Sequence, residues 1–366
     1  MLNWNNLDTL ASYQELEKAE RINLAEVMSG ENGAERVKTY STPIVDGMTF
    51  NYAAKAVDDN VLAILDKLAK EAQLVEKYES LYNGAVINTG EKRLVLHQLT
   101  RGQLGGKVEA DGVDKREFYV TQQKRIAEFA NQVHAGEITN AAGEKFTTVV
   151  QIGIGGSDLG PRAMYLAMEN WAKKNGAFKM EAKFISNVDP DDAAAVLNSI
   201  DVEHSLFVLV SKSGTTLETL TNESFVKDAL AKAGLDASKH MIAVTSETSP
   251  LAKSEDYLAA FFMDDFIGGR YSSTSAVGGA VLSLAFGPEV FAQFLEGAAE
   301  VDRRATNKNL LENPEMLDAL IGVYERNVLG YPATAVLPYS QALSRFPAHL
   351  QPVSYTHLRA HETSAH

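Results

Sequence analysis

Apolar residues in several parts of the chain recur with the spacing of an amphipathic helix. Between Asp58 and Tyr82 they stand three or four positions apart, separated by charged residues. The runs from Glu117 to His134 and from Pro314 to Asn327 show the same pattern. This spacing gathers the apolar side chains on one face of a helix. We therefore predict a helix in each of these three segments.

The pattern changes near residue 146, where short apolar runs rich in β-branched residues begin to alternate with amphipathic segments. Five strands are expected, at Phe146–Ile154, from Lys183 to Ile185, at Leu206–Val210, at Met241–Val244 and at Phe261–Met263. Four helices are expected between and after them, at Ser157–Ala172, Asp189–Ile200, Thr215–Ala233 and Ser272–Phe286. Strands that alternate with helices at this spacing form βαβ units and a parallel sheet.

This order of elements predicts an α/β fold with a parallel sheet flanked by helices, in a domain at 116–287. Residues 1–115 are expected to form the N-terminal part of a second, mainly helical α/β domain, and 288–351 to continue it. The second domain would then be assembled from both ends of the chain and interrupted by the sheet domain.

Composition narrows the class of protein. The chain has 366 residues, of which 45% are hydrophobic and 22% are charged, a balance typical of a folded protein of about two domains. The sequence contains no cysteine, which excludes disulfides, thiolate metal sites and cysteine nucleophiles. The histidines before residue 350 show no spacing typical of metal ligands.

Charge and hydropathy bear on location and partners. The N-terminus has neither a basic start nor an apolar run, so we expect no signal peptide. The longest mostly apolar stretch, near Ala276 to Phe286, is too short to span a bilayer, and we expect a cytoplasmic protein. The formal net charge of −14 disfavours nonspecific binding to nucleic acid or to an anionic membrane. An anionic substrate would need a locally positive site.

A glycine-rich loop, Gly153-Ile-Gly-Gly-Ser-Asp-Leu-Gly160, joins the first expected strand to a helix. Glycines allow the backbone to approach a ligand, and a helix N-terminus offers free N–H groups. The loop is not a dinucleotide fingerprint, because Asp158 stands where the third glycine belongs. It is not a Walker loop, because Pro161-Arg162 follows Gly160. Ligand binding and tight strand–helix packing both explain the glycines.

A second loop, Ser211-Lys212-Ser213-Gly214-Thr215-Thr216, also joins a strand to a helix. It places four hydroxyls and one ammonium at a helix N-terminus, which suits a phosphate monoester. Capping of the helix is the alternative, since Ser and Thr are favoured caps. One cap needs only one hydroxyl, and we therefore favour anion binding.

A third loop, Gly268-Gly269-Arg270-Tyr271-Ser272, precedes a helix. An arginine after paired glycines can direct its guanidinium and nearby amides toward a ligand oxygen, and it stays charged at any working pH. A surface arginine at a turn is the alternative explanation.

The three loops, in this order and spacing, resemble the glucose-6-phosphate isomerase (phosphoglucose isomerase) family. The resemblance is carried by VVQIGIGGSDLGPRAM (Val149–Met164), VLVSKSGTTLETLTNE (Val208–Glu223) and GGRYSSTSAVGG (Gly268–Gly279), and more weakly by RLVLHQLTR (Arg93–Arg101) and AVLPYSQALSRFPAHLQ (Ala335–Gln351). It implies the sugar isomerase (SIS) fold for the sheet domain and a place in glycolysis and gluconeogenesis. It also implies a homodimer with a shared site.

The resemblance also implies roles for individual residues. The sugar phosphate is expected to contact Ser157, Ser211, Lys212, Ser213 and Thr216, in a pocket that Gly156, Gly214 and Thr215 line. Gly269 and Arg270 match positions beside the reacting carbons, where arginine stabilises an enediolate. Moving a proton between adjacent carbons needs a carboxylate base but no metal or redox cofactor.

In the family, that carboxylate follows the FPAHLQ-type segment in a Glu-Ser-Asn-Gly-Lys motif. Here the resemblance stops at Gln351, and residues 352–366 match no family motif. Their YTHLRAHET string is similar to a tail that recurs in translated sequence assemblies without relation to function. We therefore expect a C-terminally truncated family member that lacks the base and is inactive as written. The alternative is a non-catalytic module that binds sugar phosphates.

Overall fold

The computed structural model of the chain describes residues 2–88 and 90–354. Two compact units are present, and each is described by itself. The first comprises residues up to Ala85, residues 104–106 and Gly297–Ala335. The second comprises Val86–Gln103, Lys107–Glu296 and the segment from Val336 onward. The domain boundaries expected from the sequence stay a prediction, and the expected tail lies outside the described residues from position 355 on.

A five-stranded parallel sheet forms the centre of the second unit, which confirms the predicted fold class. The strands are β5 (Thr148–Ile152), β6 (Glu181–Ile185), β7 (Ser205–Val210), β8 (Met241–Thr245) and β9 (Ala260–Phe262). Their order across the sheet is β6-β5-β7-β8-β9. The first of these strands in the sequence, β5, therefore lies inside the sheet. Its Val150 pairs with Lys183 of β6 on one side and with Phe207 of β7 on the other.

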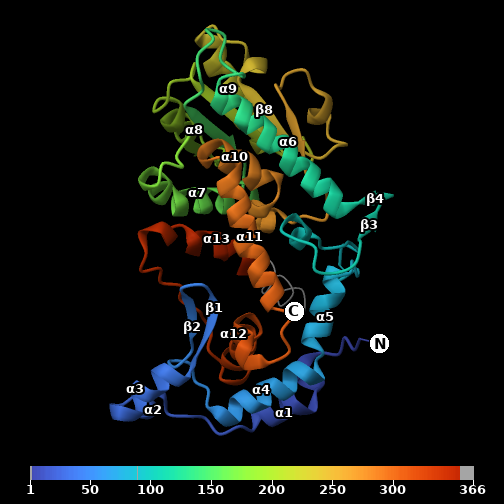
Figure 1. The fold of residues 1–366 in the computed structure, drawn as a ribbon, viewed down its shortest axis with the longest axis vertical. Helices are drawn as coiled ribbons and strands as arrows, with labels where there is room; N and C mark the ends of the chain where they lie inside the picture. Colours follow the sequence, from blue (N-terminus) through green and yellow to red (C-terminus); the bar gives the residue numbers. More distant parts are fainter. Residues whose placement is uncertain (1, 89, 355–366) are drawn as a thin grey trace. The chain divides into compact units, whose positions relative to one another are not determined.

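Helices cover both faces of this sheet (Figure 1). The helices α6 (Lys115–Ala135), α7 (Gly156–Lys174) and α10 (Ala276–Phe286) share one core with Val149 and Val208. The helices α8 (Pro190–Leu197) and α9 (Leu217–Lys232) share the other core with Val150 and Leu209. Successive residues of a strand point to opposite faces, so strands that are apolar at every position need a helical layer on each side.

The helix α10 is buried along its whole length. It begins after Ser275, whose side chain accepts a hydrogen bond from the backbone N–H of Val277. The single helix expected at Ser272–Phe286 is therefore wrong at its start, because Gly269–Thr274 forms a 3₁₀ helix, η5, before the Ser275 cap. Among the described residues, none of the helices is both long and apolar enough to cross a membrane.

The second unit also contains shorter elements. These are η2 (His97–Thr100), the strands β3 (Glu109–Ala110) and β4 (Val113–Asp114), η3 (Ala237–Lys239), η4 (Pro250–Lys253), η8 (Gln341–Leu343) and α13 (Phe346–Ser354). The helix α13 packs against α7 and η5. The helix α11 (Pro288–Arg304) begins in the second unit and ends in the first.

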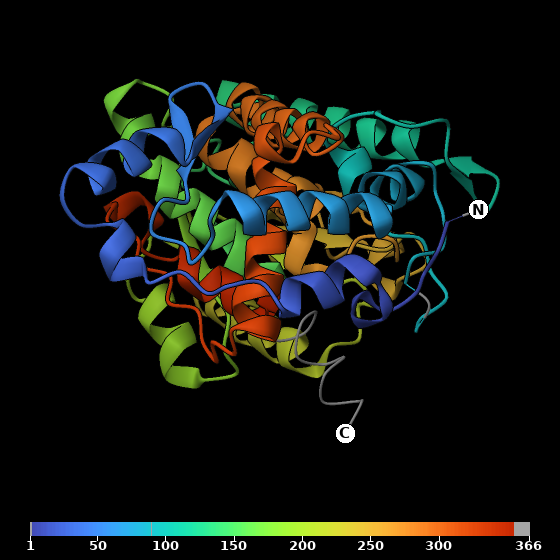
Figure 2. The ribbon, with the colours of Figure 1, turned by 90° about the horizontal axis from the view of Figure 1, so that it is seen from below.

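The first unit is mainly helical and draws on both ends of the chain. Its elements are η1 (Leu7–Thr9), α1 (Ala11–Glu17), α2 (Leu24–Val27), α3 (Gly30–Thr39), the hairpin β1 (Ser41–Val45) and β2 (Met48–Asn51), α4 (Asp59–Glu71), α5 (Leu74–Tyr82), η6 (Leu310–Glu312), α12 (Pro314–Val323) and the π-helical turn η7 (Tyr324–Val328). Helix α1 lies alongside α4 (Figure 2). One core joins Leu16, Leu65 and Leu68 to Leu317 and Tyr324.

Two expected helices of this unit differ from the structure. The segment Asp58–Tyr82 forms two helices, because Gln73 has a left-handed backbone with φ of 55°. The segment Pro314–Asn327 is α-helical only to Val323, and the π-helical turn begins at the next residue, Tyr324.

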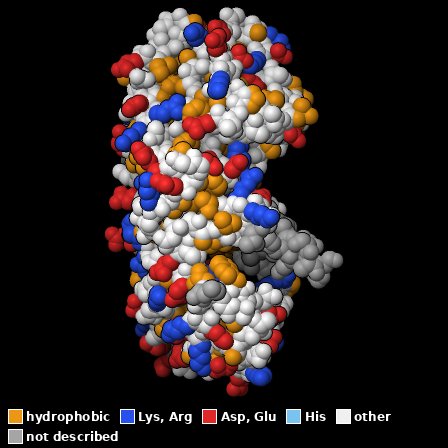
Figure 3. Space-filling model, turned by 90° about the vertical axis from the view of Figure 1, so that its right-hand side faces the viewer, with side chains coloured by type: hydrophobic (Ala, Val, Ile, Leu, Met, Phe, Trp, Pro, Cys, Tyr) orange, Lys and Arg blue, Asp and Glu red, His pale blue; other side chains and the backbone are white. Residues whose placement is uncertain are grey.

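Acidic and basic side chains are interspersed on the face of the molecule shown in Figure 3.

Candidate substrate-binding site

The strand order creates a natural ligand site at the carboxyl end of the sheet. Chain order reverses at β5, which has β6 on one side and β7 on the other. The loops that leave β5 and β7 therefore run to opposite faces of the sheet, and such a switch point is where open parallel sheets typically bind ligands. These two loops are Gly153–Gly160 and Ser211–Thr216, both singled out in the sequence.

The loop Ser211–Thr216 is held to the sheet by its backbone. Thr245, at the end of β8, donates its hydroxyl to the carbonyl oxygen of Ser211 at 2.7 Å. The backbone N–H of Ser246 donates to the carbonyl oxygen of Lys212 at 3.1 Å. Gly214 has a φ of +67°, and a side chain there would overlap the Ser249 hydroxyl, so this turn requires glycine. The loop backbone is thus fixed to the end of the sheet.

The hydroxyls of this loop point largely to solvent. Ser213, Thr215 and Thr216 are exposed, whereas Ser211 is buried. Thr216 is the N-cap residue of α9, yet its side chain makes no capping hydrogen bond. Ser213 instead accepts hydrogen bonds from the N–H of Thr215 at 3.2 Å and from its hydroxyl at 2.9 Å. Capping of α9 by Thr216 therefore does not account for its hydroxyl.

Lys212 is engaged by a carboxylate that sequence reasoning missed. Its Nζ lies 3.2 Å from Oδ1 of Asp265, and Arg93 Nη1 lies 3.6 Å from the same oxygen. Asp265 lies three residues before Gly268, the first residue of the third loop. The pair of acidic residues Asp264-Asp265 in front of that loop was a visible signal, but only the fold shows that it meets Lys212.

The first and third loops touch at their glycines. A Cβ added to Gly156 would overlap the carbonyl carbon of Gly269 and would lie 2.6 Å from the backbone nitrogen of Arg270. The hydroxyl of Ser272 donates to the carbonyl oxygens of Gly269 at 2.7 Å and of Gly156 at 3.2 Å. Glycine at position 156 therefore allows the close approach of the two loops, and it is also the first residue of α7.

Ser157 and Asp158 occupy the first turn of α7. The carbonyl oxygen of Ser157 accepts a hydrogen bond from Nε2 of Gln151 at 2.6 Å. The side chain of Ser157 is half-buried. Asp158 is buried and pairs with Arg162, whose Nε donates to it at 2.8 Å. Burial raises the pKa of the Asp158 carboxyl, and the nearby guanidinium of Arg162 opposes this rise.

Arg270 is half-buried in η5, next to Tyr271. Burial raises the pKa of the Tyr271 phenol, and the positive charge of Arg270 partly opposes this rise. The ring of His97 meets the Tyr271 ring edge-on, with centroids 4.8 Å apart. The His97–Tyr271 contact thus packs the residue that directly follows Arg270.

A buried network fixes the segment that leads into this loop. Lys115 Nζ lies 3.4 Å from Asp264, and Tyr119 donates its hydroxyl to the same carboxylate at 3.0 Å. Asp264 also accepts the N–H of Phe266 at 3.1 Å, and the N–H of Leu96 donates to the Phe266 carbonyl at 3.0 Å. Burial raises the pKa of Asp264, while Lys115 and Tyr119 act in the opposite direction.

The segment from Asp265 to Arg270 therefore connects all three loops: Asp265 meets Lys212, and Gly269 meets Gly156. His349 of α13 approaches α7 on the side that also faces η5, because a Cβ added to Gly160 would overlap the Ser273 hydroxyl and would lie 3.2 Å from the His349 ring. Burial lowers the pKa of this histidine. Within the described part of the chain, we find no cluster of three or more His, Asp or Glu side chains that could hold a metal ion.

Comparison with known proteins agrees with this arrangement. The family model described as "Phosphoglucose isomerase" matches residues 51–357. A crystal structure of a glucose-6-phosphate isomerase from Chlamydia trachomatis is 40% identical, with a TM-score of 0.86 over 96% of this chain and 66% of its own chain.

Curated relatives give the same result. Glucose-6-phosphate isomerase of Treponema denticola is 61% identical over 96% of this chain and 67% of its own length. The enzyme of that name from Borreliella afzelii is 44% identical over 96% of this chain and 66% of its own length. The chain thus spans about two thirds of the length of the relatives it matches. On the family match and these identities, the chain belongs to the phosphoglucose isomerase family.

Proposed function

We propose that the second unit binds a phosphorylated hexose through the Ser211–Thr216 loop, and that the chain serves the interconversion of glucose 6-phosphate and fructose 6-phosphate. One observation carries this proposal. At the switch point of the sheet, exposed hydroxyls and the half-exposed ammonium of Lys212 surround the N-terminus of α9, and Thr216 does not use its hydroxyl as a cap.

The phosphate is assigned to Ser211, Lys212, Ser213, Gly214, Thr215 and Thr216. The 16 residues of α9 add the positive end of a helix dipole to the charge of Lys212. Gly156 and Ser157, on the neighbouring loop, are assigned to the sugar. A phosphate held at one loop would then direct the sugar carbons toward the other.

Arg270 and Gly269 are assigned to the reacting carbons. Transfer of a proton between adjacent carbons develops negative charge on oxygen, which a fixed guanidinium stabilises. The contact between Gly156 and Gly269 supports this assignment, because it sets Arg270 beside the loop assigned to the sugar. This chemistry needs no metal or redox cofactor.

The base is assigned to a residue outside these loops. Of the carboxylates in or beside them, Asp158 pairs with Arg162, Asp264 with Lys115 and Asp265 with Lys212, while Glu218 is exposed in the first turn of α9. The family resemblance expects the base after Gln351, beyond the FPAHLQ segment. That segment lies in α13, which packs on α7 and η5, the elements that begin at Gly156 and Gly269.

A role in glycolysis and gluconeogenesis follows from the family. A cytoplasmic location and a homodimer with a shared site are part of the proposal and rest on the resemblance. The net charge of −14 supports a small-molecule substrate over nucleic acid or an anionic membrane.

Calorimetry on the folded protein tests the phosphate assignment. Lys212→Ala is expected to weaken binding of glucose 6-phosphate by about 1.5–3 kcal/mol, the range for hydrogen bonds to charged groups. Lys232→Ala is a matched control, because Lys232 lies in the last turn of the same helix. Equal affinity of the wild type and Lys212→Ala would refute the assignment, and equal weakening by both variants would indicate a nonspecific charge effect.

A further inference from the structure

Two anions can pair with the ammonium of Lys212, the Asp265 carboxylate and the substrate phosphate. The proposed function assigns it to the substrate phosphate, while the structure pairs it with Asp265 at 3.2 Å. The same Asp265 oxygen lies 3.6 Å from Arg93 Nη1, so this carboxylate stands between two cations. The exposed fractions of the three side chains are 38% for Lys212, 58% for Asp265 and 43% for Arg93. All three are therefore accessible to a ligand from solvent.

The position of Asp265 is set by its neighbours along the chain. Asp264 is bound to Lys115 and Tyr119, and Phe266 is hydrogen-bonded to Leu96. The backbone on both sides of Asp265 is thus anchored, and Arg93 belongs to the same segment as Leu96. At this position only the side chain of Asp265 can move, between Lys212 on one side and Arg93 on the other.

We propose that Asp265 is an internal competitor for phosphate: it pairs with Lys212 before ligand binds, and Arg93 retains it when the phosphate takes Lys212. The inference rests on the proposed function and assigns Asp265 and Arg93 as positioning residues that act through Lys212. They tune the affinity and the charge selectivity of the phosphate loop.

The charges explain why the exchange is favourable. A carboxylate and a phosphate beside one ammonium repel each other, and this repulsion falls as the carboxylate moves toward Arg93. A guanidinium remains charged and offers five donors, so it holds a carboxylate at any working pH. A phosphate dianion interacts more strongly with Lys212 than a carboxylate monoanion does, and it also gains the hydroxyls and amides of the loop.

This model makes opposite predictions for the two positioning residues. Removing the charge of Asp265 should tighten phosphate binding, because the competitor is lost. Removing Arg93 should weaken it, because Asp265 is left with Lys212 alone. For partly exposed pairs each change should be about two- to five-fold. If Asp265 merely tied two loops together, its removal would leave binding unchanged or weaken it.

A double-mutant cycle measured by calorimetry decides between these models, with inorganic phosphate and glucose 6-phosphate as the probes. Asp265→Asn is expected to bind both probes about two- to five-fold more tightly, and the gain should shrink as salt is raised. Arg93→Ala is expected to bind more weakly than the wild type. In the Asp265→Asn background, Arg93→Ala should have little further effect, because its partner is gone.

Each other outcome has a definite meaning. Unchanged or weaker binding by Asp265→Asn, confirmed with Asp265→Ser, would overturn the inference. An equal loss from Arg93→Ala in both backgrounds would also overturn it, because Arg93 would then contact the phosphate directly. Lys212→Ala separates the two proposals: if it leaves affinity unchanged, the phosphate assignment fails, whereas a large loss beside a neutral Asp265→Asn refutes only the role of Asp265.

Discussion

Gly156 lies against the peptide bond that joins Gly269 to Arg270, so close that its missing side chain is what allows the two loops to meet. The contact brings together the start of α7 and the start of η5, which are more than a hundred residues apart in the sequence. Because Ser272 donates to the carbonyl oxygens of both glycines, the two loop backbones form one hydrogen-bonded unit.

Gly156→Ala is expected to push the third loop away from the first, because the new methyl group would overlap the Gly269 carbonyl. Overpacking of this kind costs about 1–3 kcal/mol of the free energy of unfolding. We also expect weaker binding of glucose 6-phosphate, since Arg270 shifts with the loop. Gly297→Ala is the control, because no atom lies near its Cβ position in α11, and it should stabilise the protein by about 0.5–1 kcal/mol. Denaturant unfolding and calorimetry would contradict the prediction if the two variants behaved alike.

Thr216→Ala separates ligand binding from helix capping. Because the Thr216 side chain makes no capping hydrogen bond, its loss should change the free energy of unfolding by less than about 0.5 kcal/mol. Affinity for glucose 6-phosphate should nevertheless fall. Asp58→Ala provides the contrast, since Asp58 accepts the N–H of Val61 at 2.8 Å and its loss should cost about 1 kcal/mol without affecting binding. A stability loss for Thr216→Ala equal to that for Asp58→Ala would restore the capping explanation.

Hydrophobic periodicity predicted most strands and helices of the α/β unit, because the spacing of apolar residues along the chain determines these elements locally. Each expected strand and helix between residues 146 and 286 is present, with ends shifted by a few residues. The hairpin β1–β2 was not predicted, although its Asp46-Gly47 turn between apolar residues is a typical hairpin signal. The break at Gln73 carries no such signal, because glutamine rarely adopts a left-handed backbone.

The three loops of the candidate site could be predicted from the sequence, but their arrangement in space could not. Glycines, hydroxyls and Lys212 mark the loops in sequence, and the strand order that places them at one edge emerges only from the fold. The pairing of Lys212 with Asp265, and of Asp265 with Arg93, depends on segments far apart in the chain. No periodicity or spacing rule reports such contacts.

His204 should make the stability of the second unit depend on pH. Its two ring nitrogens lie 2.8 Å from Glu144 and 2.9 Å from Asp201, and these carboxylates raise the pKa of the histidine. A raised pKa in the folded state stabilises the fold below the unfolded pKa of about 6.5, and this stabilisation disappears as pH rises through the folded pKa. His204→Gln should therefore cost more at pH 5.5 than at pH 9, by no more than about 1 kcal/mol because the carboxylates are exposed.

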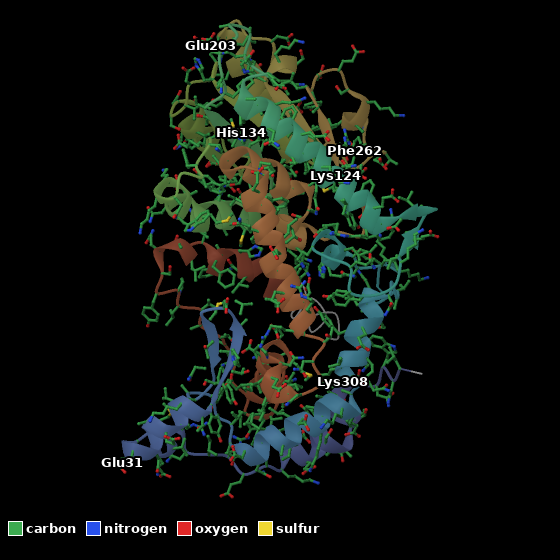
Figure 4. All side chains as sticks on the ribbon, viewed as in Figure 1. Glu31, Lys124, His134, Glu203, Phe262 and Lys308 are labelled. Carbon is green, nitrogen blue, oxygen red and sulfur yellow. The ribbon has the colours of Figure 1, made fainter. Side chains whose placement is uncertain are left out.

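His134 in α6 (Figure 4) is the control with the opposite sign. Burial lowers its pKa, so the unfolded chain takes up the proton first and stability falls as pH drops below about 6.5. His134→Gln should therefore cost less at pH 5.5 than at pH 9. Denaturant unfolding at the two pH values measures both variants, and the same pH trend in both would contradict the assignments.

The described residues are expected to bind glucose 6-phosphate without supplying the general base for its isomerisation. Asp158, Asp264 and Asp265 are each paired with a cation, and a missing general base typically costs about 10²–10⁴-fold in rate, or roughly 3–5 kcal/mol in the barrier. A coupled assay on the purified chain measures this. Turnover that is fast and is abolished by Arg270→Ala would show that one of the described residues supplies the base.

The burial of α10 has a consequence for how the second unit is made. The interior strand β5 is synthesised early, whereas α10, which helps to cover one of its faces, is complete only when synthesis has reached Phe286. Until then, the apolar face that includes Val149 and Val208 lacks part of its cover, and pairings between such distant segments form slowly. A nascent chain that stalls before Ala276 therefore exposes apolar surface of the sheet that α10 covers in the complete unit, and such surface favours aggregation.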